Sequence, residues 1–219
     1  MTKRIIITGS NGVIGEVLKK GLSDFDILGL DLPQHDISRS ETLANAIDGH
    51  DAIIHLAWNT QRDESYGVDI NPINAKMFSN VYKAALDNGV KRVIVASSVH
   101  ADDFYNHVGS ELLSPHRMPT PTSPYGADKV FMETMGRHFA SKGLEVVCIR
   151  FGGVFAGNAV NRAGEREHDV FLDHADCISL VRAILEAEKI PGTFSIVYAV
   201  SDNEGRVHDT TNVFGWKAV

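Results

Sequence analysis

The chain has 219 residues, of which 43% are hydrophobic and 22% charged, and this predicts one substantial core and a single domain over residues 1–219. Twenty-one basic against twenty-eight acidic side chains give a net charge of −7, which argues against nucleic acid or an anionic membrane as a partner. The two cysteines offer no disulfide framework and no metal site, the chain starts without a signal-peptide core, and no apolar run approaches the roughly 20 residues of a membrane helix, so we expect a cytoplasmic protein.

Short β-branched segments alternate with longer amphipathic segments along the chain. The predicted strands are residues 4–8, 27–30, 52–56, 92–96, 146–150 and 193–199. The predicted helices are residues 13–23, 40–46, 73–88, 124–142 and 173–188. Most of the strand segments are apolar at consecutive positions, as expected for strands that are covered on both faces. The alternation predicts an α/β fold in which a parallel sheet carries helices on both faces.

A glycine-rich turn with the pattern G-x-x-G-x-x-G follows the first predicted strand and opens the first predicted helix. In such a motif the glycines allow a tight turn, close approach of the backbone to a pyrophosphate, and close packing of the helix on the strand. The pyrophosphate then binds the free N–H groups at the start of the helix. An ordinary strand-to-helix turn is the alternative interpretation. The residues expected to bind a dinucleotide here are Gly9, Asn11, Gly12, Val13, Ile14 and Gly15.

Asp31 ends the second predicted strand, sixteen residues beyond Gly15. A carboxylate at this position can accept hydrogen bonds from the adenosine ribose hydroxyls, and it repels a 2′-phosphate. The next four residues include no arginine that would offset the charge, so the sequence favours NAD over NADP. A solvated acid at the end of a strand is the alternative.

Two long irregular segments, residues 99–122 and residues 152–168, lie between predicted strands and helices. The first is rich in His, Pro and Ser, and the second carries Gly, Asn and Arg. Loops of this length inside a compact α/β domain are more often functional than structural. We therefore expect both segments to contact the substrate.

Tyr125 and Lys129 stand at i and i+4, which places a phenol and an ammonium on the same face of a predicted helix. An ammonium lowers the pKa of a neighbouring phenol from about 10, so that the phenol can exchange a proton with a substrate hydroxyl. Ser97 and Ser98 end the fourth predicted strand, at the sheet edge where open α/β sheets bind ligands. A surface Tyr–Lys pair is the alternative interpretation.

The glycine motif, the acid after the second strand, the serine after the fourth strand and Tyr-x-x-x-Lys resemble the extended short-chain dehydrogenase/reductase superfamily, which includes NAD-dependent epimerases and dehydratases. The resemblance covers residues 3–199 and implies a Rossmann-type doubly wound parallel sheet with a small C-terminal substrate-binding region. It implies NAD as the cofactor and Tyr125 as the proton-transferring acid/base. It also implies that Lys129 lowers the pKa of that phenol and holds the nicotinamide ribose, while Ser98, rather than Ser97, polarises the substrate oxygen.

Further positions match the same superfamily. Asn74 matches its helix-borne asparagine near the active site, and we count it with the catalytic residues. Asp36 and Ile37 resemble its adenine-contacting pair, and Leu56 and Ala57 resemble its cofactor-side turn after the third strand. Each of these residues has a simpler alternative as a cap or loop residue.

A narrower resemblance connects residues 97–100, 125–129 and 150–162 with the uronate dehydrogenases, which oxidise a sugar acid at C1 to a lactone. It implies that Arg162 binds the substrate carboxylate, because a guanidinium is permanently charged and can bond both oxygens. Arg166 nearby is a competing candidate, and a solvated loop arginine is the alternative. The other residues implied to face the substrate are Thr60, Ser98, His100 and Gly153. For His100, a loop histidine with satisfied hydrogen bonds is the alternative interpretation.

This chain departs from the uronate dehydrogenase pattern at Val99 and Gly153, which leaves the sugar open, and it has no counterpart of the family's C-terminal segment, which leaves the oligomer interface open. A homodimer is one possibility. We predict an NAD-dependent oxidoreductase that oxidises a uronate or an aldose. One alternative is a nucleotide-sugar 4-epimerase or dehydratase that retains its NAD, although little chain follows Lys129 to cover a nucleoside diphosphate. The other is a non-catalytic dinucleotide sensor, although such proteins commonly lose the Tyr and the Lys.

Overall fold

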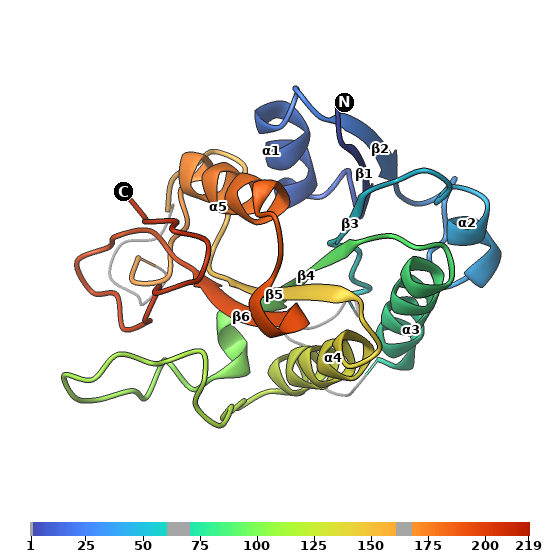
Figure 1. The fold of residues 1–219 in the computed structure, drawn as a ribbon. Helices are drawn as coiled ribbons and strands as arrows, with labels where there is room; N and C mark the ends of the chain where they lie inside the picture. Colours follow the sequence, from blue (N-terminus) through green and yellow to red (C-terminus); the bar gives the residue numbers. More distant parts are fainter. Residues whose placement is uncertain (1, 61–70, 161–167) are drawn as a thin grey trace.

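A parallel sheet forms the middle of three layers in the computed structural model, which describes residues 2–60, 71–160 and 168–219 (Figure 1). In this part of the chain the sheet has six strands in the order β2-β1-β3-β4-β5-β6. The strands are Arg4–Thr8 (β1), Asp26–Leu30 (β2), Ala52–His55 (β3), Arg92–Ser98 (β4), Glu145–Phe151 (β5) and Phe194–Ala199 (β6). The predicted α/β fold is confirmed, and every predicted strand end lies within two residues of the observed one.

Helices cover both faces of the sheet, α1 and α5 on one face and α2, α3 and α4 on the other. The helices are Val13–Gly21 (α1), Ser40–Ala44 (α2), Pro72–Asp87 (α3), Pro124–Ala140 (α4) and His174–Glu186 (α5), with 3-10 turns at Val99–Ala101 (η1) and Pro191–Thr193 (η2). Local signals explain where the longer helices begin. Ser123, for example, accepts a hydrogen bond from Gly126 N and precedes a proline in the first turn of α4.

The two faces of the sheet belong to separate apolar clusters, because side chains alternate along a strand. On β1, Ile5 and Ile7 pack toward α1 and α5, whereas Ile6 packs toward α2 and α3. All three side chains are fully buried, and burial of each contributes about 1.5–3 kcal/mol. This explains why the strand segments are apolar at consecutive positions.

The order of the strands places a crevice at one edge of the sheet. The chain passes from β1 to β2 on one side and then returns to β3 on the other side of β1. At such a switch point the crossover helices leave in opposite directions, and ligands of open α/β sheets bind outside the carboxyl ends of the strands there. The carboxyl ends of β1 and β3 therefore mark the expected cofactor site of this Rossmann-like fold.

A third, smaller apolar cluster lies beyond the carboxyl ends of β4, β5 and β6, where it joins the long segments that follow these strands. Leu113 pairs with His208 of the C-terminal segment, and Gly153 pairs with Phe171. The buried members of the cluster are Val99, Phe104, Leu113, Val170, Tyr198 and Val200. These contacts join the segment 99–122 and the C-terminal part of the chain into a small region beside the edge of the sheet.

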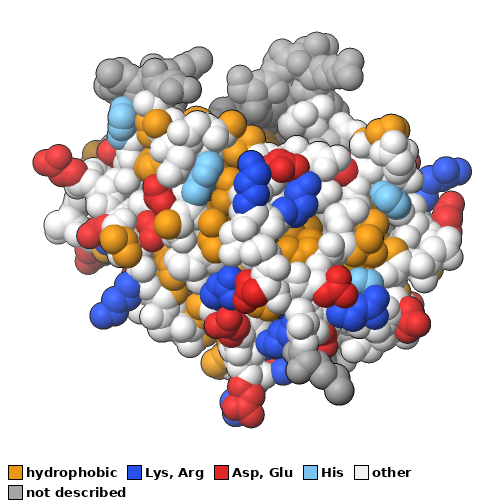
Figure 2. All heavy atoms as spheres, turned by 90° about the horizontal axis from the view of Figure 1, so that it is seen from above, with side chains coloured by type: hydrophobic (Ala, Val, Ile, Leu, Met, Phe, Trp, Pro, Cys, Tyr) orange, Lys and Arg blue, Asp and Glu red, His pale blue; other side chains and the backbone are white. Residues whose placement is uncertain are grey.

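Basic and acidic side chains are interspersed on the face that carries α1 and α5 (Figure 2). Arg182 of α5, for example, binds Asp24 in the segment after α1, with its nitrogens 2.7 Å from the carboxylate oxygens. Within residues 2–60, 71–160 and 168–219, no helix is long and apolar enough to cross a membrane. The same ranges contain no group of three or more His, Cys, Asp or Glu side chains suited to a metal ion.

Candidate active site

A cavity of about 740 Å³ lies at the carboxyl edge of the sheet. Its walls come from the glycine turn, the segment after β3, the end of β4, the first turns of α4 and the segment after β5. Most of the residues that the sequence predicts for cofactor and substrate therefore meet in one place. Those lining the cavity are Gly9, Gly12, Val13, Ile14, Gly15, Leu56, Thr60, Asn74, Ser98, His100, Tyr125, Lys129 and Gly153.

The glycine turn is shaped by close backbone contacts. Gly9 has a positive φ of 70°, and a Cβ there would lie 2.6 Å from the backbone nitrogen of Ala57. A Cβ at Gly15 would lie 2.6 Å from the carbonyl oxygen of Ser10. Gly12 begins α1 without a side-chain cap, so the first N–H groups of the helix are available to an anion. The turn thus has the form that a dinucleotide pyrophosphate requires.

Asp31 lies next to this turn. Its Oδ2 accepts a hydrogen bond from Asn11 N at 2.7 Å, and its Oδ1 accepts one from Leu32 N at 2.8 Å. The carboxylate therefore ties the end of β2 to the glycine turn while remaining partly exposed. That position suits the ribose hydroxyls of a bound dinucleotide.

Asp36 and Ile37 lie outside the residues that line the cavity. Asp36 accepts a hydrogen bond from Ser38 N, and hydrogen bonding by the Ser38 side chain, together with this N–H, lowers the pKa of the Asp36 carboxyl group. The Ile37 side chain is buried in the core with α2 and α3, and its carbonyl oxygen accepts a hydrogen bond from Asn80 Nδ2 at 3.0 Å. Asn11 and Ala57 also lie outside the residues that line the cavity. Asn11 is part of the glycine turn, and the backbone of Ala57 packs against Gly9 of that turn.

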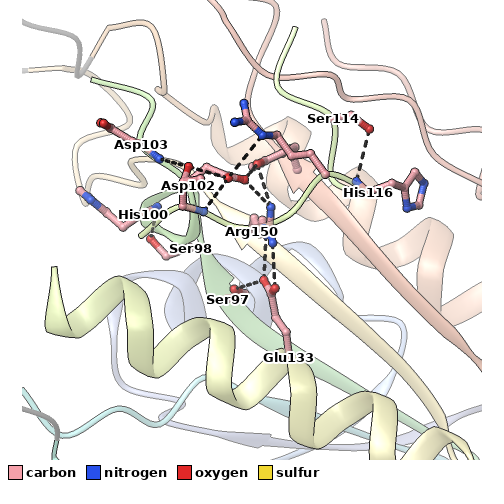
Figure 3. A network of polar contacts seen from close by, with 12 residues as sticks. Ser97, Ser98, His100, Asp102, Asp103, Ser114, His116, Glu133 and Arg150 are labelled. Carbon is pink, nitrogen blue, oxygen red and sulfur yellow. Dashed lines mark hydrogen bonds and ion pairs between the residues drawn. The ribbon is translucent and has the colours of Figure 1, made fainter. Parts of the chain in front are cut away.

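The two serines of β4 point in opposite directions because they are consecutive in a strand. Ser98 Oγ accepts a hydrogen bond from His100 N at 3.2 Å and begins η1 beside the cavity. Ser97 Oγ instead donates to Glu133 of α4 at 2.6 Å. Figure 3 shows Ser98 beside His100 and Ser97 directed toward Glu133. Both serines line the cavity, but the Ser97 hydroxyl is committed to Glu133, which leaves Ser98 as the better candidate to contact a ligand.

Arg150 forms the centre of a buried polar network behind this wall (Figure 3). Its Nε and Nη2 each donate to Glu133 at 2.8 Å, and its Nη1 donates to Asp102 at 2.7 Å and to the Tyr198 hydroxyl at 2.9 Å. The network joins α4, β5, β6 and the start of the segment 99–122. Sequence reasoning missed it, although a charged residue inside the apolar segment 146–151 was the available signal.

Tyr125 and Lys129 lie on one face of α4, as their spacing predicts. Lys129 is buried, its Nζ donates to the carbonyl oxygen of Ala96 at 2.7 Å, and the same Nζ lies 5.4 Å from the centroid of the Tyr125 ring. Burial lowers the pKa of Lys129 to about 7, against the opposing effect of carboxylates on its own helix. The ammonium and the phenol are thus brought together at the cavity wall.

Asn74 of α3 is buried, and both ends of its amide are bonded to the main chain of one residue. Its Oδ1 accepts from Asn59 N at 2.8 Å, and its Nδ2 donates to Asn59 O at 3.2 Å. Asn74 therefore holds the segment after β3 that carries Trp58 and Thr60. Trp58 lines the cavity as well, and no motif in the sequence pointed to it.

His100 contacts the ring of Tyr125, with the two ring centroids 5.7 Å apart. Burial lowers the pKa of His100 to about 4, so the imidazole is neutral near pH 7. Arg162 and Arg166 lie outside the described residues. Among the described lining residues, Lys129 is the sole lysine or arginine.

Comparison with known proteins gives a consistent result. The model of the NAD dependent epimerase/dehydratase family matches residues 5–196. The L-arabinose 1-dehydrogenase (NAD(P)(+)) of Haloferax volcanii is 30% identical, over 98% of this chain and 95% of the relative. A uronate dehydrogenase of Pseudomonas syringae pv. tomato is 30% identical, over 92% of this chain and 75% of the relative. The crystal structure of uronate dehydrogenase from Agrobacterium tumefaciens, 24% identical, has a similar fold with a TM-score of 0.84 over 100% of this chain and 85% of that chain.

Proposed function

The chain belongs to the NAD dependent epimerase/dehydratase family, and from this premise we propose that it oxidises a small sugar, a uronate or an aldose, at C1 to the lactone. The more general assignment as an NAD-dependent sugar dehydrogenase, without a named substrate, follows from its curated relatives. The observation that carries the proposal is that Ser98, Tyr125 and Lys129 line one cavity together with the glycine turn.

The residues at the switch point suit NAD. The glycine turn and the start of α1 would hold the pyrophosphate, and Asp31 would accept hydrogen bonds from the adenosine ribose, which favours NAD over NADP. Further contacts with the cofactor are proposed for Asn11, Val13, Ile14, Asp36, Ile37, Leu56 and Ala57. When bound, NAD supplies the acceptor for the hydride that leaves the sugar carbon.

Proton transfer is the task of the chain's own side chains. As the phenolate, Tyr125 would take the proton of the C1 hydroxyl while the hydride leaves the same carbon for bound NAD, which would give the lactone and the reduced cofactor. Ser98 donates a hydrogen bond to the reacting oxygen. The Lys129 ammonium favours the phenolate form of Tyr125 by its charge.

Recognition of the sugar is proposed for residues around this centre. Thr60, His100 and Gly153 line the cavity, and a neutral imidazole can both donate to and accept from sugar hydroxyls. Arg162 is proposed to bind the carboxylate of a uronate. The segments 99–122 and 152–168 would then form the outer part of the substrate site.

Incubation of the purified protein with NAD and a panel of aldoses, uronates and nucleotide sugars tests the proposal, with NADH absorbance as the readout. We expect NADH to form with a free sugar. Conversion of a nucleotide sugar without net NADH would indicate an epimerase, and NAD binding without turnover would indicate a sensor; either result overturns the proposal. As a control, Tyr125→Phe should bind NAD normally but lose about a hundredfold or more in kcat.

A further inference from the structure

Trp58, just after β3, covers both members of the proposed proton-transfer pair. The Lys129 Nζ lies 3.8 Å from the centroid of the indole ring. The Tyr125 ring meets the indole edge to face, with a centroid distance of 5.3 Å and an interplanar angle of 86°. We propose that Trp58 is a positioning residue for the reaction, one that holds the Lys129 ammonium against its indole face and fixes Tyr125 beside it. The proposal rests on the proposed function for the roles of Lys129 and Tyr125.

The surroundings of Lys129 explain why an aromatic face is needed. A buried ammonium requires compensation, and one of its three N–H groups bonds the Ala96 carbonyl. In the part of the chain that the structure describes, no carboxylate forms an ion pair with Lys129. Its neighbours on α4 are engaged elsewhere, since Asp128 accepts from a backbone N–H and Glu133 bonds Arg150. The π face of Trp58, 3.8 Å from the Nζ, is therefore the nearer of the two aromatic faces that contact the ammonium, since the Tyr125 ring centroid lies 5.4 Å away.

The position of Trp58 is itself fixed from α3. The Asn74 amide bonds both the N–H and the carbonyl oxygen of Asn59, the next residue along the chain. Phe78 of the same helix contacts the indole at a centroid distance of 6.0 Å. Asn74 and Phe78 thus keep the indole over Lys129, and Asn74 acts on the reaction through Trp58.

Several charged or titratable groups surround the Lys129 ammonium. Asp128 and Glu133 on α4 favour its charged form, whereas burial opposes it, and His55 at the end of β3 is kept neutral by its own burial and by the charge of Lys129. Trp58→Leu would keep an apolar cover but remove the π face, so the pKa of Lys129 should fall further. Trp58→Phe would keep an aromatic face.

Tryptophan fluorescence tests the contact without any need for activity. The chain has two tryptophans, and Trp216→Phe leaves Trp58 as the sole tryptophan, which is excited selectively over the tyrosines. Trp216 packs against α5 away from the cavity, where its Nε1 donates to Ser179. Emission is recorded from about pH 5.5 to about pH 9.5 without cofactor, a range that spans the titration of a buried lysine.

We expect the emission of Trp58 to change with pH in the single-tryptophan protein and in its Tyr125→Phe variant. Lys129→Met, which keeps a buried side chain of similar length without the charge, should abolish this change. If the Lys129→Met variant gave the same pH curve as the protein that keeps the lysine, the proposal would be overturned. Because this readout needs no turnover, it remains decisive even if the protein oxidises no sugar.

The pH profile of kcat/KM supplies the second test. In Trp58→Leu, loss of the π face should shift the alkaline fall of kcat/KM to lower pH by about half a unit to one unit. The reason is that Lys129 then loses its proton at a lower pH. In Trp58→Phe, the alkaline fall of kcat/KM should occur at nearly the same pH as in the parent protein. Trp216→Phe is the matched control. If kcat/KM fell at the same alkaline pH in Trp58→Leu and Trp58→Phe, the proposal would be contradicted. If Trp58→Leu does not fold, the fluorescence comparison with Lys129→Met decides alone.

Discussion

At the scale of single residues, Asp31 combines a structural and a proposed binding task in one carboxylate. It already accepts hydrogen bonds from Asn11 N and Leu32 N, and the ribose hydroxyls of NAD would add to these. We expect Asp31→Ala to raise the Kd for NAD about tenfold to a hundredfold, because a hydrogen bond to a charged acceptor contributes about 1.5–3 kcal/mol. Calorimetric titration with NAD and with NADP measures the effect.

Asp31→Asn is the matched control for the charge. The amide keeps an acceptor oxygen for Asn11 N, so the glycine turn should remain supported. Without the negative charge, a 2′-phosphate is repelled less, and NADP should bind more tightly than it binds the parent. Equal Kd values for NAD and NADP in the unmodified protein would contradict the role assigned to Asp31.

Arg162, which lies outside the described residues, separates a sugar-acid dehydrogenase from one that acts on neutral sugars. If it pairs with a carboxylate in an enclosed site, Arg162→Ala should raise KM for a uronate by a factor that corresponds to about 2–5 kcal/mol. KM for the matching neutral sugar should barely change. Arg166→Ala is the control, and equal effects of Arg162→Ala on acid and neutral sugars would exclude the uronate assignment.

At the scale of the elements, the Arg150 network fixes α4 against β5 and thereby places Tyr125 and Lys129 opposite the end of β4. Arg150→Met leaves the carboxylates of Glu133 and Asp102 buried without their cation. We expect a loss of about 3–5 kcal/mol in the free energy of unfolding, measured with urea at neutral pH. Arg150→Lys should recover only part of this, because an ammonium cannot bond both carboxylates as a planar guanidinium does.

Arg182→Met tests whether such a cost is particular to a buried ion pair. Arg182 binds Asp24 at the surface, where the two side chains are 30% and 61% exposed. Its loss should cost less than about 1 kcal/mol, because water screens and replaces an exposed pair. If the two arginine variants had the same stability, the Arg150 network would not be what holds α4 in place.

At the scale of the whole molecule, His208 joins the C-terminal segment to the small apolar cluster beside β6. Its ring lies 4.6 Å from that of Tyr198, and neither ring nitrogen has a hydrogen-bond partner among the described residues. Burial lowers the pKa of His208 to about 3. Between the ordinary value near 6.5 and this one, the unfolded chain binds a proton that the folded chain does not, so stability falls as the pH falls.

This residue therefore contributes an acid sensitivity that a substitution can remove. From pH 7 to pH 5 the linkage of one such histidine costs about 2 kcal/mol of stability. His208→Phe keeps an aromatic ring in the cluster and should remove this part of the loss, as measured by urea unfolding at both pH values. His116→Phe, at an exposed position of the segment 99–122, is the matched control for the substitution itself. An unchanged loss in His208→Phe would show that the ring is protonated in the folded protein.

The sequence by itself determined the elements of the fold and a set of candidate site residues, most of which line the cavity. Apolar runs and the glycine turn act within a few residues, so their patterns predict the ends of strands and helices to within two residues. The carboxyl ends of parallel strands meet at one edge, and for this reason Ser98 and the glycine turn share a cavity. The i, i+4 spacing placed Tyr125 and Lys129 on one face of α4.

Contacts between elements were decided only by the tertiary structure. Arg150 meets Glu133 across 17 residues of sequence and Asp102 across 48, and no local periodicity encodes such partners. Likewise the amide of Asn74 is committed to Asn59, and Trp58 covers Lys129, because α3 and α4 pack side by side on the same face of the sheet. The period of apolar residues in the sequence predicts which face of a helix or strand is buried. The residues that pack on that face depend on how the elements are ordered and packed in three dimensions.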